Sequence, residues 1–344
     1  MFQFATHKLI LLSLWAAGSL SSVQASPPVL PVQSAASGAQ ARPAERGVSQ
    51  WLVRMHEASR LRSYVGTFVV TSSSGMSSAR IWHACDGDLQ VERVESLTGA
   101  PRSTFRHNEQ VVTFLPESRV ARIEKRESLG LFPNLLKSSD SSIPEFYAAK
   151  RVAADRVAGF EADVIQLVPK DNLRFGYRIW SEKKTGLMVK LQTLDTDGGV
   201  LEQAAFSELQ LDAPVRIDKL RQMMASTEGW RVEKTDTVKT NASAEGWHLK
   251  AAVAGFKPVG CYKRPPFGSA APEGTMHWIF SDGLAAVSLF VEAYDKQRHV
   301  QEGLFANGAT QTLTRQVQDW WLTAVGEVPG ATLKAFALSL ERRK

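Results

Sequence analysis

The chain has 344 residues, of which 44% are hydrophobic and 22% charged, and its formal net charge is +6. At about 100–200 residues per domain, this length favours two domains. The composition excludes a wholly disordered chain, a collagen-like fibre and a protein with many membrane spans, and the small, interspersed positive excess lacks the concentrated basic patch of a nucleic-acid-binding protein.

Residues 1–25 have the pattern of a secretory signal peptide. Lys8 precedes an apolar run from Leu9 to Ala17, and Val23-Gln24-Ala25 fits a small-x-small cleavage site. The run is shorter than the ~20 apolar residues that span a bilayer, which favours cleavage near Ala25 over an uncleaved anchor. Residues 26–46 are rich in Pro, Ala, Ser and Gly, so we expect a disordered leader there.

The next segments predict a large β domain over residues 47–211. Ser49 is a candidate N-cap, and apolar residues at helical spacing from Trp51 onward predict a helix that ends near Ser63. From Tyr64 the period changes to two. Short strands separated by turn signals then predict a curved antiparallel meander, with the helix covering one face. The expected strands lie near 64–71, 79–84, 89–95, 103–107, 110–115, 119–125, 151–157, 160–168, 174–182, 186–195 and 199–210.

We expect a linker over residues 212–227, with a short helix at 216–224, and a small α+β domain over 228–344. Strands are expected near 229–239, 246–252, 276–281 and 285–294. Thr314 is a candidate cap for a helix that carries Val317, Trp320, Trp321, Ala324 and Val325, and Pro329 begins a last helix.

The sequence contains none of the common catalytic or nucleotide-binding motifs. It lacks a G-x-S-x-G elbow, a P-loop, an H-E-x-x-H motif and a G-x-G-x-x-G loop, and its seven His residues are scattered. We therefore expect no catalytic residue, no metal site and no cofactor, and classify the chain as a non-enzyme. An unrecognised hydrolase stays open, because catalytic groups can converge from distant positions.

Two groups of residues are candidate binding elements. An apolar cluster could line a lipid cavity or form ordinary core, and a basic strand could dock an acidic partner or form a solvated face, since acidic residues are interspersed with it. The cluster consists of Leu129, Leu131, Phe132, Leu135 and Leu136, and the basic group of Arg119, Arg122, Lys125 and Arg126. Trp321, next to Trp320, could contact a partner or the neighbouring domain.

Cys85 and Cys261 are the only cysteines and lie far apart in the sequence. In an oxidising compartment they could form a disulfide, which requires Cα atoms within ~7 Å, or they could be two unrelated thiols.

An ordered series of short blocks points to a known family. In the first domain the blocks are Tyr64-Val65-Gly66-Thr67-Phe68-Val69, Arg80-Ile81-Trp82-His83, Asp86-Gly87, Val91-Glu92-Arg93, Gly99-Ala100-Pro101-Arg102, Glu124-Lys125-Arg126, Arg156-Val157-Ala158-Gly159, Pro169-Lys170-Asp171, Arg174-Phe175-Gly176-Tyr177, Gly186-Leu187, Glu202-Gln203 and Phe206. In the second they are Gly255-Phe256, Ser281-Asp282-Gly283-Leu284-Ala285, Val287-Ser288-Leu289-Phe290-Val291-Glu292, Asn307-Gly308-Ala309 and Val325-Gly326-Glu327-Val328-Pro329. With this series the sequence resembles, over about residues 47–340, the RseB/MucB family of periplasmic regulators of the envelope-stress sigma factor.

The resemblance implies a two-domain α+β fold. The large N-terminal domain would be a half-open antiparallel β-barrel with covering helices, similar to the lipoprotein carriers LolA and LolB, and the C-terminal domain a small α+β unit. It also implies a periplasmic protein that binds the periplasmic segment of an RseA/MucA-like anti-sigma factor and shields it from proteolysis. Release would be linked to lipopolysaccharide or acyl chains, and a homodimer is a further possibility.

A periplasmic lipid or lipoprotein carrier is the alternative that the barrel shape leaves open. A carrier would leave the second domain unexplained, and this domain therefore favours the regulator.

Overall fold

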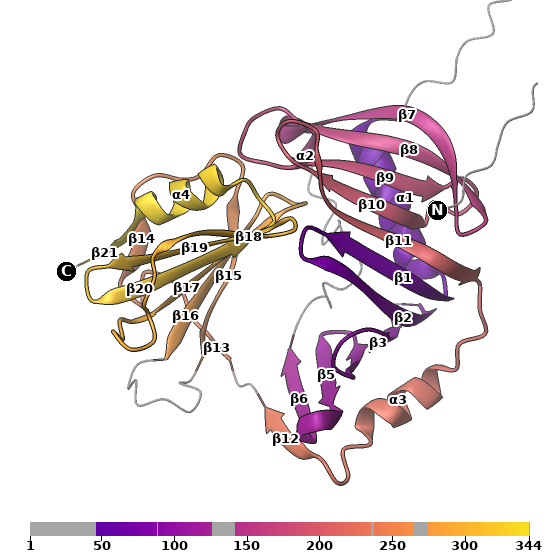
Figure 1. Cartoon of the computed structure of the whole chain (residues 1–344), viewed down its shortest axis with the longest axis horizontal. Helices are drawn as coiled ribbons and strands as arrows, with labels where there is room; N and C mark the ends of the chain where they lie inside the picture. The colour runs from indigo at the N-terminus through magenta and orange to yellow at the C-terminus, as the bar shows by residue number, and fades with distance from the viewer. Residues whose placement is uncertain (1–45, 88, 126–141, 235–236, 265–273, 344) are drawn as a thin grey trace, which may run out of the picture. The chain divides into compact units, whose positions relative to one another are not determined.

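The computed structural model describes residues 46–87, 89–125, 142–234, 237–264 and 274–343 (Figure 1). The described chain is mostly β-structure with few helices. Within these ranges no helix is both long and apolar enough to cross a membrane.

The first sheet has twelve strands in the order β12-β6-β5-β4-β3-β2-β1-β11-β10-β9-β8-β7. Its neighbours pair antiparallel except β12 and β6, which are parallel. The strands are β1 Tyr64–Ser72, β2 Gly75–Asp86, β3 Leu89–Ser96, β4 Ser103–His107, β5 Gln110–Leu115, β6 Val120–Lys125, β7 Tyr147–Val157, β8 Phe160–Pro169, β9 Gly176–Glu182, β10 Met188–Leu194, β11 Val200–Leu211 and β12 Arg231–Lys234. The predicted meander is confirmed, and the short helix α2 (Ile143–Phe146) precedes β7.

The N-terminal helix α1 spans Val48–Leu61 and covers one face of this sheet, as the apolar spacing predicts (Figure 1). Trp51 and Leu52, each 2% exposed, pack with Ile165, Leu167 and Ile179 of β8 and β9. The helix ends where the backbone of Arg62 becomes extended and leads into β1.

The sheet is curved but is not closed into a barrel. Val94 of β3 and Val157 of β7 belong to one buried cluster, although six strands separate β3 from β7 in the sheet order. The two end strands, β12 and β7, are not paired with each other.

The short helix predicted at 216–224 is confirmed, but the strand that follows it differs from our expectation. Helix α3 (Ile217–Ala225) lies within the predicted linker, and Leu220 and Met224 pack on Phe105 and Val112 of the first sheet. Residues 231–234, which we expected in the second domain, form β12 of the first sheet. The apolar face of α3 explains this, because burying it brings the following residues alongside β6.

The second sheet has seven strands in the order β13-β15-β16-β17-β20-β19-β18. These are β13 Val238–Lys239, β15 Lys257–Arg264, β16 Thr275–Ser281, β17 Ala286–Ala293, β18 Gly303–Asn307, β19 Thr310–Val317 and β20 Trp320–Gly326. Strands β14 (Trp247–Leu249) and β21 (Leu340–Arg342) form a separate two-stranded antiparallel sheet in the second domain.

The prediction of a helix after Thr314 is wrong. Residues 310–317 and 320–326 form a hairpin, β19 and β20, joined at Gln318, which has φ +56°. The spacing of Val317, Trp321 and Ala324 fits a helix, but pairing of β20 with β17 overrides this pattern and turns alternate residues inward.

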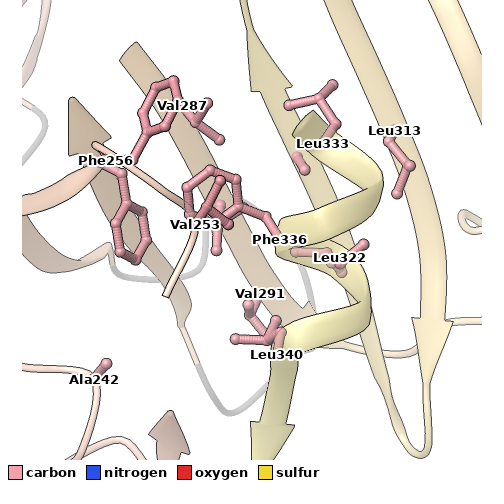
Figure 2. Packing of buried hydrophobic residues seen from close by; sticks show 14 of the residues in the cluster. Ala242, Val253, Phe256, Val287, Val291, Leu313, Leu322, Leu333, Phe336 and Leu340 are labelled. Carbon is pink, nitrogen blue, oxygen red and sulfur yellow. The ribbon is translucent and has the colours of Figure 1, made fainter. Parts of the chain in front are cut away.

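The last helix, predicted from Pro329, is confirmed as α4 (Gly330–Ser339). Figure 2 shows Phe336 of α4 extending into the core of the second domain. Phe336 is fully buried, and its ring lies 5.7 Å from that of Phe256 and 4.8 Å from that of Phe280.

Phe336→Ala should lower the free energy of unfolding by about 3–5 kcal/mol, because it leaves a cavity among aromatic rings that cannot collapse fully. Leu338→Ala is the matched control on the same helix, since Leu338 is 68% exposed. Urea unfolding followed by tryptophan fluorescence measures both variants. Equal losses would show that α4 does not hold this core together.

Candidate functional site

A fully buried arginine joins the first domain to the second. Arg174, in the loop between β8 and β9, is 0% exposed. Its Nε donates to Oδ2 of Asp282 at 2.7 Å, its Nη2 donates to the carbonyl of Ala254 at 2.7 Å, and its Nη1 pairs with Asp171. Asp282 and Ala254 belong to the second domain, so the guanidinium binds both halves of the chain.

Aromatic rings cover the faces of this guanidinium. The Cζ atom of Arg174 lies 4.2 Å from the ring centroid of Phe146 and 4.9 Å from that of Phe256. Gly255 has φ +80°, and a Cβ atom there would lie 2.0 Å from Nη2 of Arg174. Only glycine therefore combines this backbone conformation with room for the arginine.

The acidic partner is held in place by its own turn. Asp282 lies between β16 and β17, and its Oδ1 accepts hydrogen bonds from the backbone N–H groups of Leu284 and Ala285, at 2.9 and 2.8 Å. The hydroxyl of Tyr147 donates to Oδ2 at 3.5 Å. Burial raises the pKa of Tyr147 well above its usual value, so this group remains a neutral donor.

Apolar contacts cross the same joint in both directions. Leu173 of the first domain packs against the core of the second, and Leu284 of the second packs against the core beneath α1. Thr332 of α4, also fully buried, donates its hydroxyl to the carbonyl of Leu173 at 2.7 Å. We call the group Asp171, Leu173, Arg174, Ala254, Asp282, Leu284 and Thr332 the arginine joint.

A second buried polar cluster lies inside the first domain. The carboxylate of Glu92 accepts hydrogen bonds from Nδ1 of His83 at 2.8 Å and from Nε of Arg106 at 2.9 Å. Burial opposes ionisation, but the hydrogen bonds from His83 and Arg106 outweigh it and lower the pKa of Glu92 to about 2. Tyr64 stacks on the His83 ring at 4.8 Å.

The predicted basic strand is paired rather than open along its backbone. Lys125 is exposed, and Arg119 adopts a left-handed conformation with φ +52°. Arg122 lies 3.4 Å from Glu233 of β12, the strand that occupies this edge of β6. Arg126 and the apolar cluster of residues 129–136 lie outside the described residues, and the binding roles of all of them remain predictions.

Of the other candidate residues, Trp321 and Cys261 are buried and Cys85 is half-buried. Trp321 is 5% exposed, and its ring stacks on His299 at 4.9 Å and 6°. Cys85 and Cys261 are both free thiols in the structure. Burial, with a smaller effect of Glu245, raises the pKa of the Cys261 thiol to about 11.

Our list of candidate site residues missed the arginine joint, although the sequence contained a signal for it. Arg174 and Asp282 lie in two of the blocks that carry the family resemblance, but they are 108 residues apart, and no spacing rule pairs them. No group of three or more His, Cys, Asp or Glu side chains among the described residues is placed to hold a metal ion.

Comparison with known proteins decides the family. The family model for the MucB/RseB N-terminal domain matches residues 47–224, and the model for the MucB/RseB C-terminal domain matches residues 241–341. The chain belongs to the MucB/RseB family. This membership confirms the predicted resemblance, the two-domain organisation and the classification as a non-enzyme.

Curated relatives match nearly the whole chain. The sigma factor AlgU regulatory protein MucB of Pseudomonas aeruginosa is 29% identical over 299 residues, which cover 85% of this chain and 90% of that protein. The sigma-E factor regulatory protein RseB of Escherichia coli K12 is 23% identical over 305 residues, covering 88% and 92%.

Solved structures show the same two-domain fold. MucB in complex with MucA(peri) matches with a TM-score of 0.65 and 27% identity, covering 86% of this chain and 99% of that one. The P. aeruginosa MucA/MucB complex matches with a TM-score of 0.66 and 26% identity, again covering 86% and 99%.

Asp282→Ala should destabilise this family member by about 3–5 kcal/mol, because it leaves the buried Arg174 without its buried counter-charge. Glu161→Gln, which removes an exposed ion pair with Lys183, is the control and should leave the unfolding midpoint unchanged. Urea unfolding measures both variants. Similar midpoints for the two would show that the joint contributes no more than a surface ion pair.

Glu92→Gln should reduce stability at neutral pH by about 3 kcal/mol, since one pKa unit corresponds to about 1.4 kcal/mol. The folded-state pKa of Glu92 lies below its ordinary value of 4.5. Its stabilisation is therefore present above pH 4.5 and is lost as the pH falls from 4.5 towards 2. Between pH 4.5 and 2 the variant should therefore lose less free energy of unfolding than the parent chain. Glu95→Gln, on the same strand and more exposed, should change neutral-pH stability little.

Proposed function

We propose that the chain is a periplasmic regulatory protein that binds the periplasmic segment of a transmembrane anti-sigma factor. The observation that carries the proposal is the match to MucB in complex with MucA(peri), which extends over both domains and 99% of that chain. The predicted signal peptide supports export to the periplasm, with cleavage near Ala25. The second domain, which a lipid carrier does not need, supports a regulator.

The arginine joint supports this role physically. It buries ionic, aromatic and apolar contacts between the domains, so a partner that touches both domains meets them in a defined arrangement. A surface that is already ordered loses less conformational entropy on binding than a flexible one. The proposal is therefore that the partner binds a preformed two-domain surface.

We further propose that binding shields the anti-sigma factor from proteolysis and so restrains the envelope-stress sigma factor. Release would follow the binding of lipid or lipopolysaccharide to the curved first domain, acting as a half-open barrel like those of LolA and LolB. Each buried CH₂ group of an acyl chain contributes about 0.8 kcal/mol, which gives such a ligand ample free energy to compete. A lipid or lipoprotein carrier is the alternative function.

Calorimetric titration of residues 26–344 with the periplasmic segment of the same organism's anti-sigma factor tests the proposal. We expect a dissociation constant of about 1 µM or tighter, corresponding to about −8 kcal/mol. A scrambled segment of the same composition is the control. No binding by the folded protein, together with tight acyl-lipid binding, would contradict the proposal and favour the carrier.

The same titration in saturating lipopolysaccharide tests the release step. A ligand shifts binding only by its differential affinity for two states, so competition should weaken the apparent affinity at least tenfold. An unchanged affinity for the anti-sigma segment would show that lipopolysaccharide does not release it, and would contradict the release step. Lys125→Glu in the same assay tests the predicted basic strand.

A further inference from the structure

Strand β18, at one end of the second sheet, has a free hydrogen-bonding edge. Within the part of the chain that the structure describes, β18 pairs only with β19. A turn of two residues joins these strands, so Asn307 and Thr310, which flank it, form a hydrogen-bonded pair. Hydrogen bonding alternates along an antiparallel pair, and the backbone N–H and C=O groups of Leu304 and Ala306 therefore point away from β19. Another extended segment can bind to these groups.

The edge of β18 lacks the charged residues that protect the other end strands. Its sequence, Gly303–Asn307, contains no Lys, Arg, Asp, Glu or Pro. The end strands of the first sheet, β12 and β7, carry charged residues such as Lys234 and Lys150, and β13 has only two residues. Charged side chains and very short strands are common means by which sheets avoid pairing with other chains. The absence of both at β18 indicates an edge that accepts a further strand.

Apolar side chains at β18 and just before it are exposed. Val300 is 81% exposed and Phe305 is 44% exposed, and Leu304 is exposed as well. Phe305 is the only aromatic residue among the exposed large hydrophobic side chains of the described residues. Exposed apolar groups beside unpaired backbone groups are typical of a surface that binds another polypeptide.

The edge is fixed in place and leads onto the first domain. The side chain of Leu304 lies so close to Gly330, the first residue of α4, that a Cβ atom there would clash with it. At the other end of β18, the turn lies against the first domain. A Cβ atom at Gly308 would lie 2.7 Å from Oε2 of Glu202 and 2.9 Å from Cβ of Ser72. A segment that pairs with β18 and continues past this turn therefore reaches both domains.

We propose that β18 binds an extended, uncharged segment of the anti-sigma factor as an added strand, an inference that rests on the proposed function. The backbone groups of Leu304 and Ala306 hold the segment by hydrogen bonds, and Phe305 packs against one of its apolar side chains. The segment is uncharged where it pairs, because β18 offers no group that could compensate a buried charge.

The size of the edge favours this partner over a second copy of the chain. A strand of five residues is about 17 Å long, and two such strands cover only part of the ~1,600 Å² that a standard protein interface buries. A longer segment that continues from β18 onto the first domain adds contacts beyond the strand. This is the arrangement expected of a partner that binds a two-domain surface.

Calorimetric titration of residues 26–344 with the periplasmic anti-sigma segment tests the inference through Ala306→Pro. This change removes an outward N–H group and leaves the bonds between β18 and β19 in place, and edge strands tolerate proline there. We expect the dissociation constant to rise at least tenfold. Ala306→Lys, which adds a charge to the edge, should also weaken binding and decides the question if the proline variant does not fold by circular dichroism.

Ala154→Pro is the matched control. Ala154 is exposed on β7, and the two-residue turn after Val157 likewise directs its N–H group away from the neighbouring strand. This variant should bind as the parent chain does. A parent chain that binds, with unchanged affinity in both Ala306 variants, overturns this inference and leaves the proposed function intact. A folded parent chain that does not bind overturns both.

Hydrogen exchange shows directly whether a strand is added. The outward amides of Leu304 and Ala306 should exchange at least tenfold more slowly when the anti-sigma segment is bound, whereas the Phe305 amide, already bonded to β19, should change little. Unchanged exchange at Leu304 and Ala306 in the complex overturns the inference. Protection that rises with chain concentration in the absence of the segment also overturns it, because the edge would then bind a second copy.

Discussion

The burial of one guanidinium is the constraint on which the two-domain structure depends. Removing a charged arginine from water costs several kcal/mol, and this cost is offset only when carboxylates and carbonyl groups satisfy it with good geometry. The first domain supplies Asp171 alone, while Asp282 and the Ala254 carbonyl come from the second. Arg174 therefore has a complete set of partners only when both domains are folded and in contact.

The surrounding structure adapts to this one side chain. Phe146 and Phe256 exclude water from its faces, which strengthens the ion pairs by lowering the local dielectric. Gly255 leaves the space that the guanidinium occupies, and the turn at Asp282 is fixed by two backbone hydrogen bonds. Leu173, next to Arg174, packs on the hydrophobic core of the second domain, and Leu284, two residues after Asp282, packs on the core beneath α1 in the first. Each core is therefore in contact with the loop that carries the other domain's ionic partner.

Local pattern predicted much of the fold, and long-range contact explains what it missed. The helix from Val48, the meander of the first sheet and the helix from Gly330 each have an uninterrupted period or a clear turn signal. Residues 310–326 fit both the helical period and the strand period of two, and only the pairing of β20 with β17 makes this segment a pair of strands. Similarly, β12 joins the first sheet because α3 packs there, which no local pattern reports. The candidate site was least predictable, because Arg174 and Asp282 are ordinary charged residues until the fold brings them together.

The arginine joint couples the folding of each domain to its contact with the other. Blocks that carry the family resemblance supply Asp171, Arg174, Asp282 and Leu284, so these blocks meet in space at the arginine joint. A partner that binds one arrangement of the two domains more tightly shifts the population towards that arrangement by its difference in affinity and by no more. If the chain regulates an anti-sigma factor, the joint is the element through which a ligand on one domain can alter the surface that both domains present.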